Sequence, residues 1–262
     1  MKNYLVIGSP INHSLSPLLH NHWIKENNIK AVYSRKELND GELENLISDV
    51  KTGKIDGVNV TVPFKEKIIS YIDELSPEAD TTKSVNTIFL NNGKINGHNT
   101  DIYGFEKALQ NTKFNTLNKK IFILGAGGVV PSIIVALNKM KVSEITLSNR
   151  TKNKAETLKN LYKHLNIVDW GEIPDFDMII NATSVGLNKQ ESLNLDFSKM
   201  KDKFFYDVIY NPNETDFLKN AKKLKNTIEN GKKMFVYQAA AAFKIWHGIE
   251  PKINNKIFEL LD

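Results

Sequence analysis

Short apolar runs rich in β-branched residues alternate with amphipathic stretches along the whole chain. Runs of this length are typical of buried strands, and the stretches between them carry apolar residues at helical spacing. From the N-terminus, the pattern predicts strands at 4–8, 31–38 and 57–63 and helices at 16–28, 41–51 and 65–73. Ser16 is suited to the N-cap of the first helix and Pro17 to its first turn. Strands and helices that alternate in this way predict parallel sheets.

A different pattern separates this series from a second one. Residues 85–101 place two apolar strands on either side of the sequence Asn-Asn-Gly, which is typical of a β-hairpin. After a helix over 101–110, the pattern predicts strands at 120–124, 143–151, 176–184 and 204–210, a helix through about Met140 and a last helix at 232–248. The sequence therefore predicts an α/β fold with two domains that join near residues 101–115, with a cleft between them.

The composition is that of a soluble globular protein, since 41% of the 262 residues are hydrophobic and 25% are charged. No apolar run approaches the roughly 20 residues that a membrane helix needs. Residues 1–11 resemble a first strand more than a signal peptide. The chain contains no cysteine, which excludes disulfides, thiolate metal sites and a cysteine nucleophile. We expect a cytoplasmic protein.

The formal net charge of +5 raises the question of nucleic-acid binding. The lysines are scattered among acidic residues, and no basic run is interleaved with aromatic residues. An ordinary solvated surface explains this pattern best, a small anionic ligand comes second, and nucleic acid is a distant third. Four histidines suggest a metal site, but His20 and His22 are two positions apart and would not share a helix face. We therefore expect no metal.

A glycine turn opens the second series. Gly125 and Gly127 follow a predicted strand and precede a predicted helix, with Pro131 suited to its first turn. Glycines in this context let the backbone approach a pyrophosphate at the helix N-terminus. The third glycine of the dinucleotide fingerprint is absent, because Val130 stands in its place. From these residues alone, a dinucleotide site and a purely structural turn both stay open.

The end of the next strand favours one dinucleotide over the other. Enzymes that use NAD usually place an acidic residue there, which binds the ribose 2′-hydroxyl. This chain instead has Asn149, Arg150 and Thr151, with Lys152 and Lys154 close behind. A planar guanidinium suits a 2′-phosphate, and lysines at a helix N-terminus oppose the helix dipole unless an anion compensates. The pattern therefore favours NADP over NAD.

The strand at 176–184 has small, mostly polar residues where it leaves the predicted sheet. The carboxyl ends of strands face the ligand in a doubly wound sheet. Ala182, Thr183 and Ser184 would therefore line the nicotinamide half of a cofactor site. Ordinary loop chemistry explains these residues almost as well.

The stretch NVTVPFK, residues 59–65, alternates valines with hydrogen-bonding residues. In a strand, the valines share one face, while Asn59 and Thr61 share the other. Buried polar groups need hydrogen-bond partners or a ligand. Pro63 would end the strand, and Lys65 would emerge at its carboxyl end, where open α/β sheets place ligands.

Together, the motifs resemble those of the shikimate dehydrogenase family. They come in family order and span nearly the whole chain: SLS at 14–16, NVTVPFK at 59–65, VNT at 85–87, HNTD at 98–101, GAGG at 125–128, NRT at 149–151, NATS at 181–184, YNP at 210–212 and GKKMFVYQAA at 231–240. The resemblance implies NADPH-dependent, reversible reduction of 3-dehydroshikimate to shikimate in the pathway to aromatic amino acids. It also implies a substrate-binding domain of residues 1–101 and 238–262 and a Rossmann-like NADP-binding domain of residues 102–237.

The resemblance also assigns roles to individual residues, with Lys65 and Asp101 as the catalytic pair. Substrate contacts would come from Ser14, Ser16, Thr61, Asn86, Asp101, Tyr210 and Gln238. Cofactor contacts would come from Gly125, Ala126, Gly127, Gly128, Val129, Asn149, Arg150, Thr151, Lys154, Thr183, Val208, Gly231 and Met234. Lys65 fits the chemistry, because hydride transfer to a ketone leaves negative charge on the oxygen and needs a cation or proton donor beside it.

Other interpretations stay open. Ser16 and Asp101 each stand where helix caps are common. A quinate/shikimate dehydrogenase of broader specificity would fit most motifs, although such relatives often accept NAD and Arg150 argues against that. The intact Lys65 and Asp101 argue against a catalytically silent NADP-binding relative. The sequence leaves open whether the protein forms a homodimer.

Overall fold

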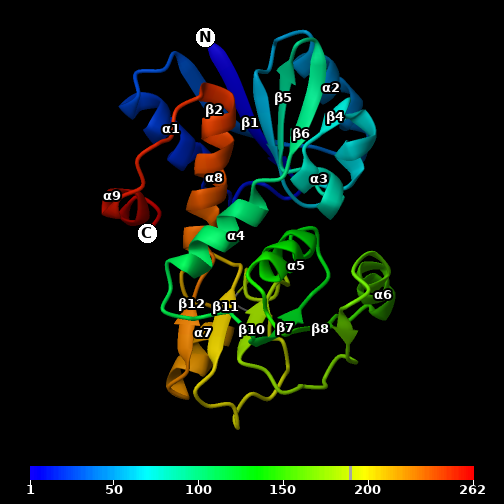
Figure 1. Ribbon diagram of the computed structural model, residues 1–262. Helices are drawn as coiled ribbons and strands as arrows, with labels where there is room; N and C mark the ends of the chain where they lie inside the picture. Colours follow the sequence, from blue (N-terminus) through cyan, green and yellow to red (C-terminus); the bar gives the residue numbers. More distant parts are fainter. Residues whose placement is uncertain (189–190) are drawn as a thin grey trace. The chain divides into compact units, whose positions relative to one another are not determined.

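The computed structural model describes residues 1–188 and 191–262 and divides into two compact units. The first unit comprises Met1–Gly104 and Val236–Asp262, and the second comprises Phe105–Phe235. Both borders fall inside helices, namely α4 (Asp101–Gln110) and α8 (Lys232–His247), as Figure 1 shows. The chain therefore passes from one unit to the other along helices.

The first unit is built on a six-stranded sheet with strand order β2-β1-β3-β5-β6-β4. Besides parts of α4 and α8, its described elements are β1 (Lys2–Gly8), α1 (Ser16–Glu26), β2 (Ala31–Glu37), the 3₁₀ helix η1 (Asp40–Glu42), α2 (Leu43–Lys51), β3 (Gly57–Val60), the 3₁₀ helix η2 (Lys67–Tyr71), β4 (Glu74–Leu75), α3 (Pro77–Thr82), β5 (Thr87–Asn91), β6 (Lys94–His98) and α9 (Asn255–Glu259). The valines and isoleucines of β3 and β5 pack with α2 in a buried core.

The predicted hairpin is present and joins this sheet. Strands β5 and β6 pair antiparallel, and the turn residues Asn92 and Gly93 have φ angles of 49° and 76°. An Asn-Gly pair adopts positive φ readily, and such a turn matches the twist of the strands it connects. Strand β5 also pairs antiparallel with β3, whereas β1 pairs in parallel with both β2 and β3. The sheet is therefore mixed, although the alternating pattern predicted parallel strands.

The segment after β3 differs from the prediction in two ways. The strand ends at Val60, before the expected Pro63, and the Phe64 amide donates to the Thr61 carbonyl to close a turn. The helix predicted at 65–73 is reduced to the 3₁₀ helix η2. Ile68 is buried, and Ile69, Tyr71 and Ile72 are partly buried against the same core. These apolar side chains therefore reach the core from a 3₁₀ helix instead of an α-helix.

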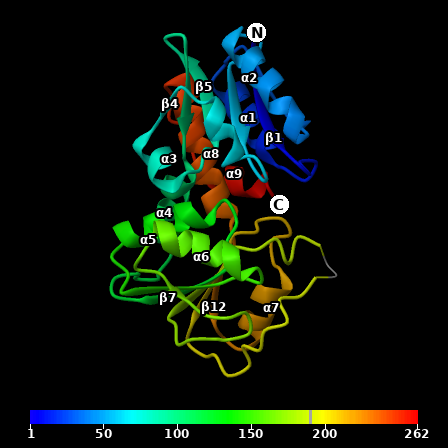
Figure 2. The same ribbon diagram turned by 90° about the vertical axis from the view of Figure 1, so that its right-hand side faces the viewer.

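The second unit has a six-stranded sheet with strand order β12-β11-β10-β7-β8-β9, in which neighbouring strands are parallel. Its described elements are β7 (Lys120–Leu124), α5 (Val130–Lys139), β8 (Glu144–Ser148), α6 (Lys152–Leu161), β9 (Asn166–Ile167), β10 (Met178–Asn181), β11 (Phe204–Asp207), α7 (Asp216–Lys223) and β12 (Thr227–Glu229). Figure 2 shows α5 and α6 on one face of the sheet and α7 on the other. This is the doubly wound arrangement expected from the sequence.

The strand order of the second sheet reverses between β7 and β10, because β8 and β9 extend it in one direction and β11 and β12 in the other. Open α/β sheets bind ligands at such a switch point, beyond the carboxyl ends of the strands. Across the two described stretches, no helix is long and apolar enough to cross a membrane. Nor do three His, Asp or Glu side chains in them gather as metal ligands would.

Candidate active site

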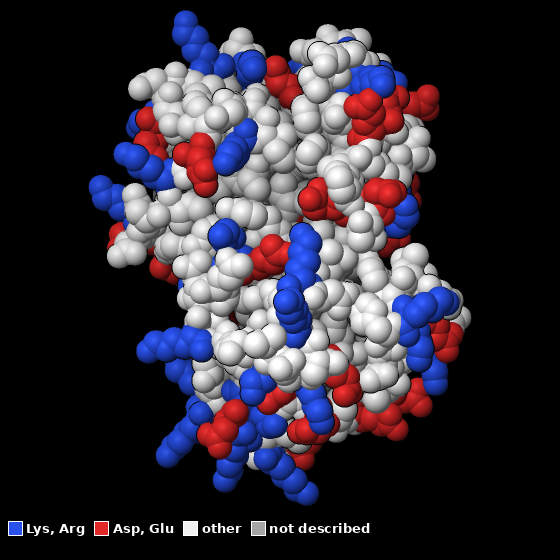
Figure 3. Space-filling model, viewed as in Figure 1, with Lys and Arg blue, Asp and Glu red and all other residues white. Residues whose placement is uncertain are grey.

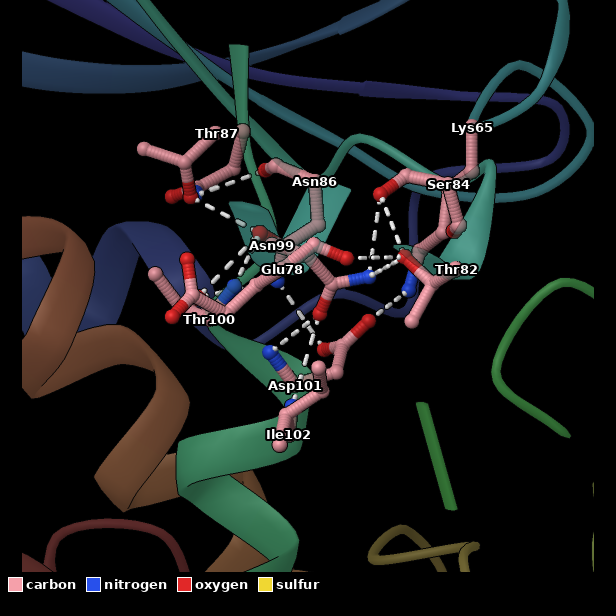
Figure 4. A network of polar contacts seen from close by, with 11 residues as sticks. Lys65, Glu78, Thr82, Ser84, Asn86, Thr87, Asn99, Thr100, Asp101 and Ile102 are labelled. Carbon is pink, nitrogen blue, oxygen red and sulfur yellow. Dashed lines mark hydrogen bonds and ion pairs between the residues drawn. The ribbon is translucent and has the colours of Figure 1, made fainter. Parts of the chain in front are cut away.

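Lys65 and Asp101 meet inside the first unit. Lys65 follows the turn after β3, and Asp101 is the first residue of α4. The Lys65 Nζ lies 2.5 Å from Asp101 Oδ2, and the two side chains are 11% and 7% exposed. Charges buried to this degree need a partner, because removal from water is costly for each of them alone. The structure therefore brings these two predicted residues together as a buried ion pair (Figure 4).

Asn86 holds the Asp101 carboxylate from the other side. Its Nδ2 donates to Asp101 Oδ1 and to Thr100 Oγ1, both at 2.9 Å. Its Oδ1 accepts from the Thr100 amide at 2.9 Å and from the Thr87 hydroxyl at 3.0 Å. One carboxylate oxygen of Asp101 therefore faces Lys65 and the other faces Asn86, which fixes the orientation of the carboxylate (Figure 4).

The polar face of β3 finds its partners within the protein. The side-chain oxygen of Asn59 accepts from the Tyr33 hydroxyl at 2.7 Å. Its Nδ2 donates to the Asn86 carbonyl and to Thr87 Oγ1, both at 3.1 Å. Asn59 thus connects β2 with the residues that hold Asp101. Sequence reasoning placed Asn59 on a polar face and included Thr87 in the VNT motif, but it assigned no role to Thr87.

Ser14 and Ser16 lie side by side at the start of α1. The Ser14 hydroxyl donates to the Ser16 hydroxyl at 3.2 Å and accepts from the Ser16 amide at 3.3 Å. Both residues are buried. The predicted N-cap role of Ser16 is wrong, because Leu15 is the N-cap and Ser16 is already helical. In the first turn, the Ser16 amide already donates to Ser14, and Pro17 has no amide hydrogen. The two hydroxyls at the positive end of the helix therefore suit a carboxylate ligand.

The remaining substrate candidates are distributed over both units. Thr61 is half-buried in the turn after β3, and Gln238 is half-buried on α8 in the first unit. Tyr210 belongs to the second unit, where its ring stacks on Phe235 with 4.2 Å between the centroids. The structure thus joins Lys65, Asn86 and Asp101 by direct contacts, whereas Tyr210 lies in the other unit.

The predicted glycine turn connects β7 to α5. Gly125 has a φ of +108°, and a Cβ there would lie 2.8 Å from the Ala182 carbonyl oxygen. Backbone conformation and packing both require glycine at this position. At Gly127, by contrast, a Cβ would meet nothing within 4 Å. The fold itself does not require that glycine, and the open space there fits a pyrophosphate that approaches the backbone. Ala126, Gly128 and Val129 complete the loop, and Val129 is the N-cap of α5.

Arg150 stands in the turn between β8 and α6. The Asn149 side chain holds this turn, because its Nδ2 donates to the Thr151 carbonyl at 2.7 Å. Thr151 is the N-cap of α6, but its side chain does not cap the first helical amides. Uncapped amides and the exposed guanidinium of Arg150 both favour an anion at this point.

One lysine of the same basic segment already has a partner. The Lys152 Nζ lies 2.7 Å from Asp169 Oδ1, and this hydrogen bond and the attraction between the charges raise the pKa of Lys152. Within residues 1–188 and 191–262, Arg150 and Lys154 make no ion pair. Arg150 and Lys154 therefore have no carboxylate partner to give up to a 2′-phosphate, whereas Lys152 has one. The residues at the predicted dinucleotide site thus fit NADP.

Thr183, Val208 and Gly231 follow the neighbouring strands β10, β11 and β12. The Thr183 hydroxyl donates to Asn181 Oδ1 at 2.7 Å. Gly231 packs directly on the backbone of Val208, because a Cβ on Gly231 would lie 2.1 Å from the Val208 carbonyl oxygen. Met234 lies within the first turn of α8 and is buried. Thr183, Val208 and Gly231 therefore stand at the carboxyl ends of the strands, where a cofactor would bind.

A buried acid that sequence reasoning missed fixes these loops. Asp207, the last residue of β11, accepts hydrogen bonds from Asn181 Nδ2 at 3.1 Å, the Ile209 amide at 3.0 Å and the Thr215 hydroxyl at 2.6 Å. Burial raises the pKa of Asp207 to about 6, and the three hydrogen bonds oppose this effect without cancelling it. The sequence offered no signal for Asp207, because an acid after an apolar strand is common in loops.

The two units supply complementary chemistry. In the first unit, a buried ammonium beside a carboxylate can stabilise and protonate a reacting oxygen, and the paired serine hydroxyls suit an acidic small molecule. In the second unit, the glycine turn and the exposed arginine suit a phosphorylated dinucleotide. The combination is suited to reduction of a carbonyl group by a nicotinamide cofactor.

Family models match three parts of the chain. Residues 6–88 match a model described as shikimate dehydrogenase substrate binding domain, and residues 106–216 match one described as shikimate / quinate 5-dehydrogenase. Residues 233–254 match a model described as shikimate 5'-dehydrogenase C-terminal domain. The three matches follow one another in the order of the motifs identified in the sequence.

Individual relatives agree with the family models. A shikimate dehydrogenase (NADP(+)) of Pelagibacter ubique is 55% identical over 262 residues, which cover 100% of this chain and 99% of the relative. The crystal structure of shikimate dehydrogenase from Aquifex aeolicus has a TM-score of 0.91 and 38% identity, covering 100% of this chain and 97% of that chain. The Thermus thermophilus enzyme in complex with NADP(H) and shikimate has a TM-score of 0.90 and 30% identity, covering 100% and 98%.

Proposed function

The chain belongs to the shikimate dehydrogenase family, and we propose that it reduces 3-dehydroshikimate to shikimate reversibly, with Lys65 and Asp101 as its catalytic pair. It is an oxidoreductase that uses NADP, like the relatives it matches. The observation that carries the catalytic assignment is the buried ion pair with 2.5 Å between Lys65 Nζ and Asp101 Oδ2. This pair lies in the unit whose residues 6–88 match a substrate-binding domain.

Lys65 and Asp101 divide the proton chemistry between them. NADPH, when bound, supplies the hydride that reduces the carbonyl carbon. Negative charge then develops on the carbonyl oxygen, where the Lys65 ammonium stabilises it and donates the proton that completes the alcohol. Asp101 holds the ammonium in place, and Asn86 holds Asp101 through the hydrogen bond to its other oxygen. Solvent restores the proton of Lys65 after each turnover.

The substrate carboxylate is assigned to Ser14 and Ser16. Their hydroxyls lie 3.2 Å apart, both residues are buried, and α1 begins at Ser16. Hydroxyls at the positive end of a helix favour a carboxylate. Thr61, Asn86, Tyr210 and Gln238 complete the proposed contacts to the substrate hydroxyls.

The second unit is assigned to NADP. The open space at Gly127 supports an approach of the pyrophosphate, and Arg150 with Lys154 supports recognition of the 2′-phosphate. Thr183, Val208, Gly231 and Met234 are proposed for the nicotinamide half, beyond the carboxyl ends of the strands. We place the border between the substrate and NADP domains at residues 101/102 and 237/238, inside α4 and α8.

The cell compartment and the partners follow from less specific features. A cytoplasmic location is supported by the absence of cysteine from the sequence. Nucleic acid is not a proposed partner, because basic and acidic side chains are interspersed on the face that Figure 3 shows. A homodimer is the oligomer to test, by sedimentation at several protein concentrations.

One assay tests the proposed function against its alternatives. Shikimate oxidation is followed by the absorbance of the reduced nicotinamide, with NADP⁺ and NAD⁺ in parallel, and then with quinate in place of shikimate. Turnover of shikimate that strongly favours NADP⁺ supports the proposal. Comparable turnover of quinate would point to the broader quinate/shikimate enzyme. Tight NADP binding without turnover of either substrate would point to a catalytically silent relative.

A further inference from the structure

Asn99 lies between the hairpin and α4, two residues before Asp101, and is 5% exposed. Its Oδ1 accepts from the backbone amides of Asp101 at 3.0 Å and Ile102 at 3.4 Å. Its Nδ2 donates to Thr82 Oγ1 at 3.1 Å and to the Ser84 carbonyl at 3.0 Å. Figure 4 shows this side chain among the residues of the polar network, between Thr82 and Ser84 on one side and Asp101 on the other.

Asn99 caps α4 in place of Asp101. An aspartate at the start of a helix often accepts hydrogen bonds from the first-turn amides with its own carboxylate. Here Asn99 Oδ1 accepts from the first amides of α4. Both carboxylate oxygens of Asp101 are therefore free to face Lys65 and Asn86. By capping α4, Asn99 thus leaves the Asp101 carboxylate for the ion pair with Lys65.

The other end of the Asn99 side chain reaches the segment that holds Lys65. Its Nδ2 donates to the Ser84 carbonyl, and the next residue, Val85, donates its backbone amide to the Lys65 carbonyl at 2.9 Å. A single buried side chain therefore connects the backbone of Asp101 with the segment that fixes the backbone of Lys65. These two backbone positions set the distance between the ammonium and the carboxylate.

We propose that Asn99 is a positioning residue, which sets the relative placement of Lys65 and Asp101 for the reaction. The proposal rests on the proposed catalytic role of that pair. A displacement of about 1 Å can lower an enzyme's rate about a hundredfold, because reacting groups must be held in near-attack geometry. Loss of the Asn99 amide would also leave the buried Ser84 carbonyl without this donor, which favours a shift of the segment.

Two substitutions of Asn99 separate its role as the cap of α4 from its hydrogen bonds to Thr82 and Ser84. Serine caps helices about as well as asparagine, but the short hydroxyl of Asn99→Ser cannot also reach Thr82 and Ser84. Asn99→Ala removes both functions. We expect both variants to lower kcat for shikimate oxidation about tenfold or more, while the dissociation constant for NADP⁺ changes less than about twofold.

A double-mutant cycle tests whether Asn99 acts through Asp101. If it does, adding Asn99→Ala to Asp101→Asn should lower kcat less than about threefold further, because the pair is already disrupted. A matched control is Asn254→Ala, which removes the cap of α9, where the Asn254 side-chain oxygen accepts from the Ile257 amide. This control should lower the melting temperature and retain kcat.

The outcomes distinguish a failure of the positioning role of Asn99 from a failure of the proposed catalytic pair. Normal kcat in Asn99→Ser, or losses from Asn99→Ala and Asp101→Asn that simply multiply, would overturn the positioning role. An unchanged kcat in Asp101→Asn alone would overturn the proposed pair, and the role of Asn99 with it. Reduced kcat in both Asn99 variants, together with the small further loss in the double variant, supports the proposal.

Discussion

The Lys65 ammonium and the Asp101 carboxylate are 36 positions apart in the sequence and meet at 2.5 Å in the first unit. The two side chains are 11% and 7% exposed, so removal of either one leaves a buried charge without its partner. Loss of either side chain is therefore expected to lower stability as well as the proposed catalysis, and experiments must separate the two effects.

Lys65→Ala is expected to lower kcat by about 10²–10⁴-fold, the usual contribution of a positioned proton donor. The Michaelis constant for shikimate should change far less, because the other proposed substrate contacts remain. Asp101→Asn keeps the shape but loses the charge that orients the lysine, so it should lower kcat too. Because the two residues act as a unit, the double variant should be little worse than either single variant. Steady-state kinetics of the four proteins measure this.

Lys67→Ala is a suitable control for the lysine substitution. Lys67 also pairs with an aspartate, Asp40, but these side chains are 48% and 67% exposed, and exposed pairs contribute little. The control should retain both kcat and stability. Near-normal turnover in Lys65→Ala would show that this lysine has no catalytic role, whatever its contacts.

Arg150→Ala is expected to weaken NADP⁺ binding about ten- to a hundredfold and to leave NAD⁺ binding almost unchanged. A charge-assisted hydrogen bond contributes about 1.5–3 kcal/mol, which corresponds to that range of affinity. Lys152→Ala is the matched control, because Lys152 already pairs with Asp169 at 2.7 Å. Titration of each variant with both dinucleotides gives the four dissociation constants. Equal losses for NADP⁺ and NAD⁺ would mean that Arg150 does not recognise the 2′-phosphate.

Ser14→Ala combined with Ser16→Ala is expected to raise the Michaelis constant for shikimate and to change kcat little. Hydroxyls that bind a carboxylate away from the reacting carbon contribute similarly in the ground state and the transition state. NADP⁺ binding should stay normal, which serves as the internal control for folding. A double variant that binds shikimate normally but unfolds at lower temperature would limit the two serines to stabilising the start of α1.

Local signals explain which parts of the fold could be predicted. The hairpin around Asn92 and Gly93 and the turn at Gly125 each depend on a backbone conformation that few residues adopt. The short elements β4, α3 and β9 were missed, because two to six residues are too few to show a periodic pattern. The end of β3 was misplaced, because the chain already turns at Thr61, before the proline.

The residues of the candidate site also differ in whether a local sequence signal predicts them. Lys65 and Asp101 stand in motifs that a sequence displays, whereas the residues that hold them are defined by contacts between distant segments. Asn99 has a local signal, since an asparagine two residues before a helical aspartate suits a cap, but its bond to Ser84 depends on the fold. Asp207 has no local signal, because an acid at the end of an apolar strand is common and its bond from Asn181, 26 positions away, depends on the fold.

His20 offers a separate test of the first unit. Its ring stacks on Tyr33 with 4.2 Å between the centroids, the residue is 1% exposed, and within the described residues neither ring nitrogen has a hydrogen-bond partner. Burial, and to a lesser extent the charge of His247, lowers the pKa of His20 from 6.5 to about 3. The native protein therefore keeps this ring neutral at pH values where the unfolded chain protonates it.

The sign of the pH effect follows from the lowered pKa of His20. Its contribution to stability is fully present above about pH 6.5 and is lost as the pH falls toward 3, because the unfolded state binds the proton first. Between pH 7 and pH 5, this loss amounts to about 2 kcal/mol.

His20→Phe keeps a ring in the stack and removes the titration. The variant should therefore exceed the parent in free energy of unfolding, by a margin that grows by about 2 kcal/mol from pH 7 to pH 5. Urea unfolding at both pH values measures this margin, with His22→Phe on the same helix as the control for an added ring. An equal margin at both pH values would mean that His20 does not stay neutral in the native protein.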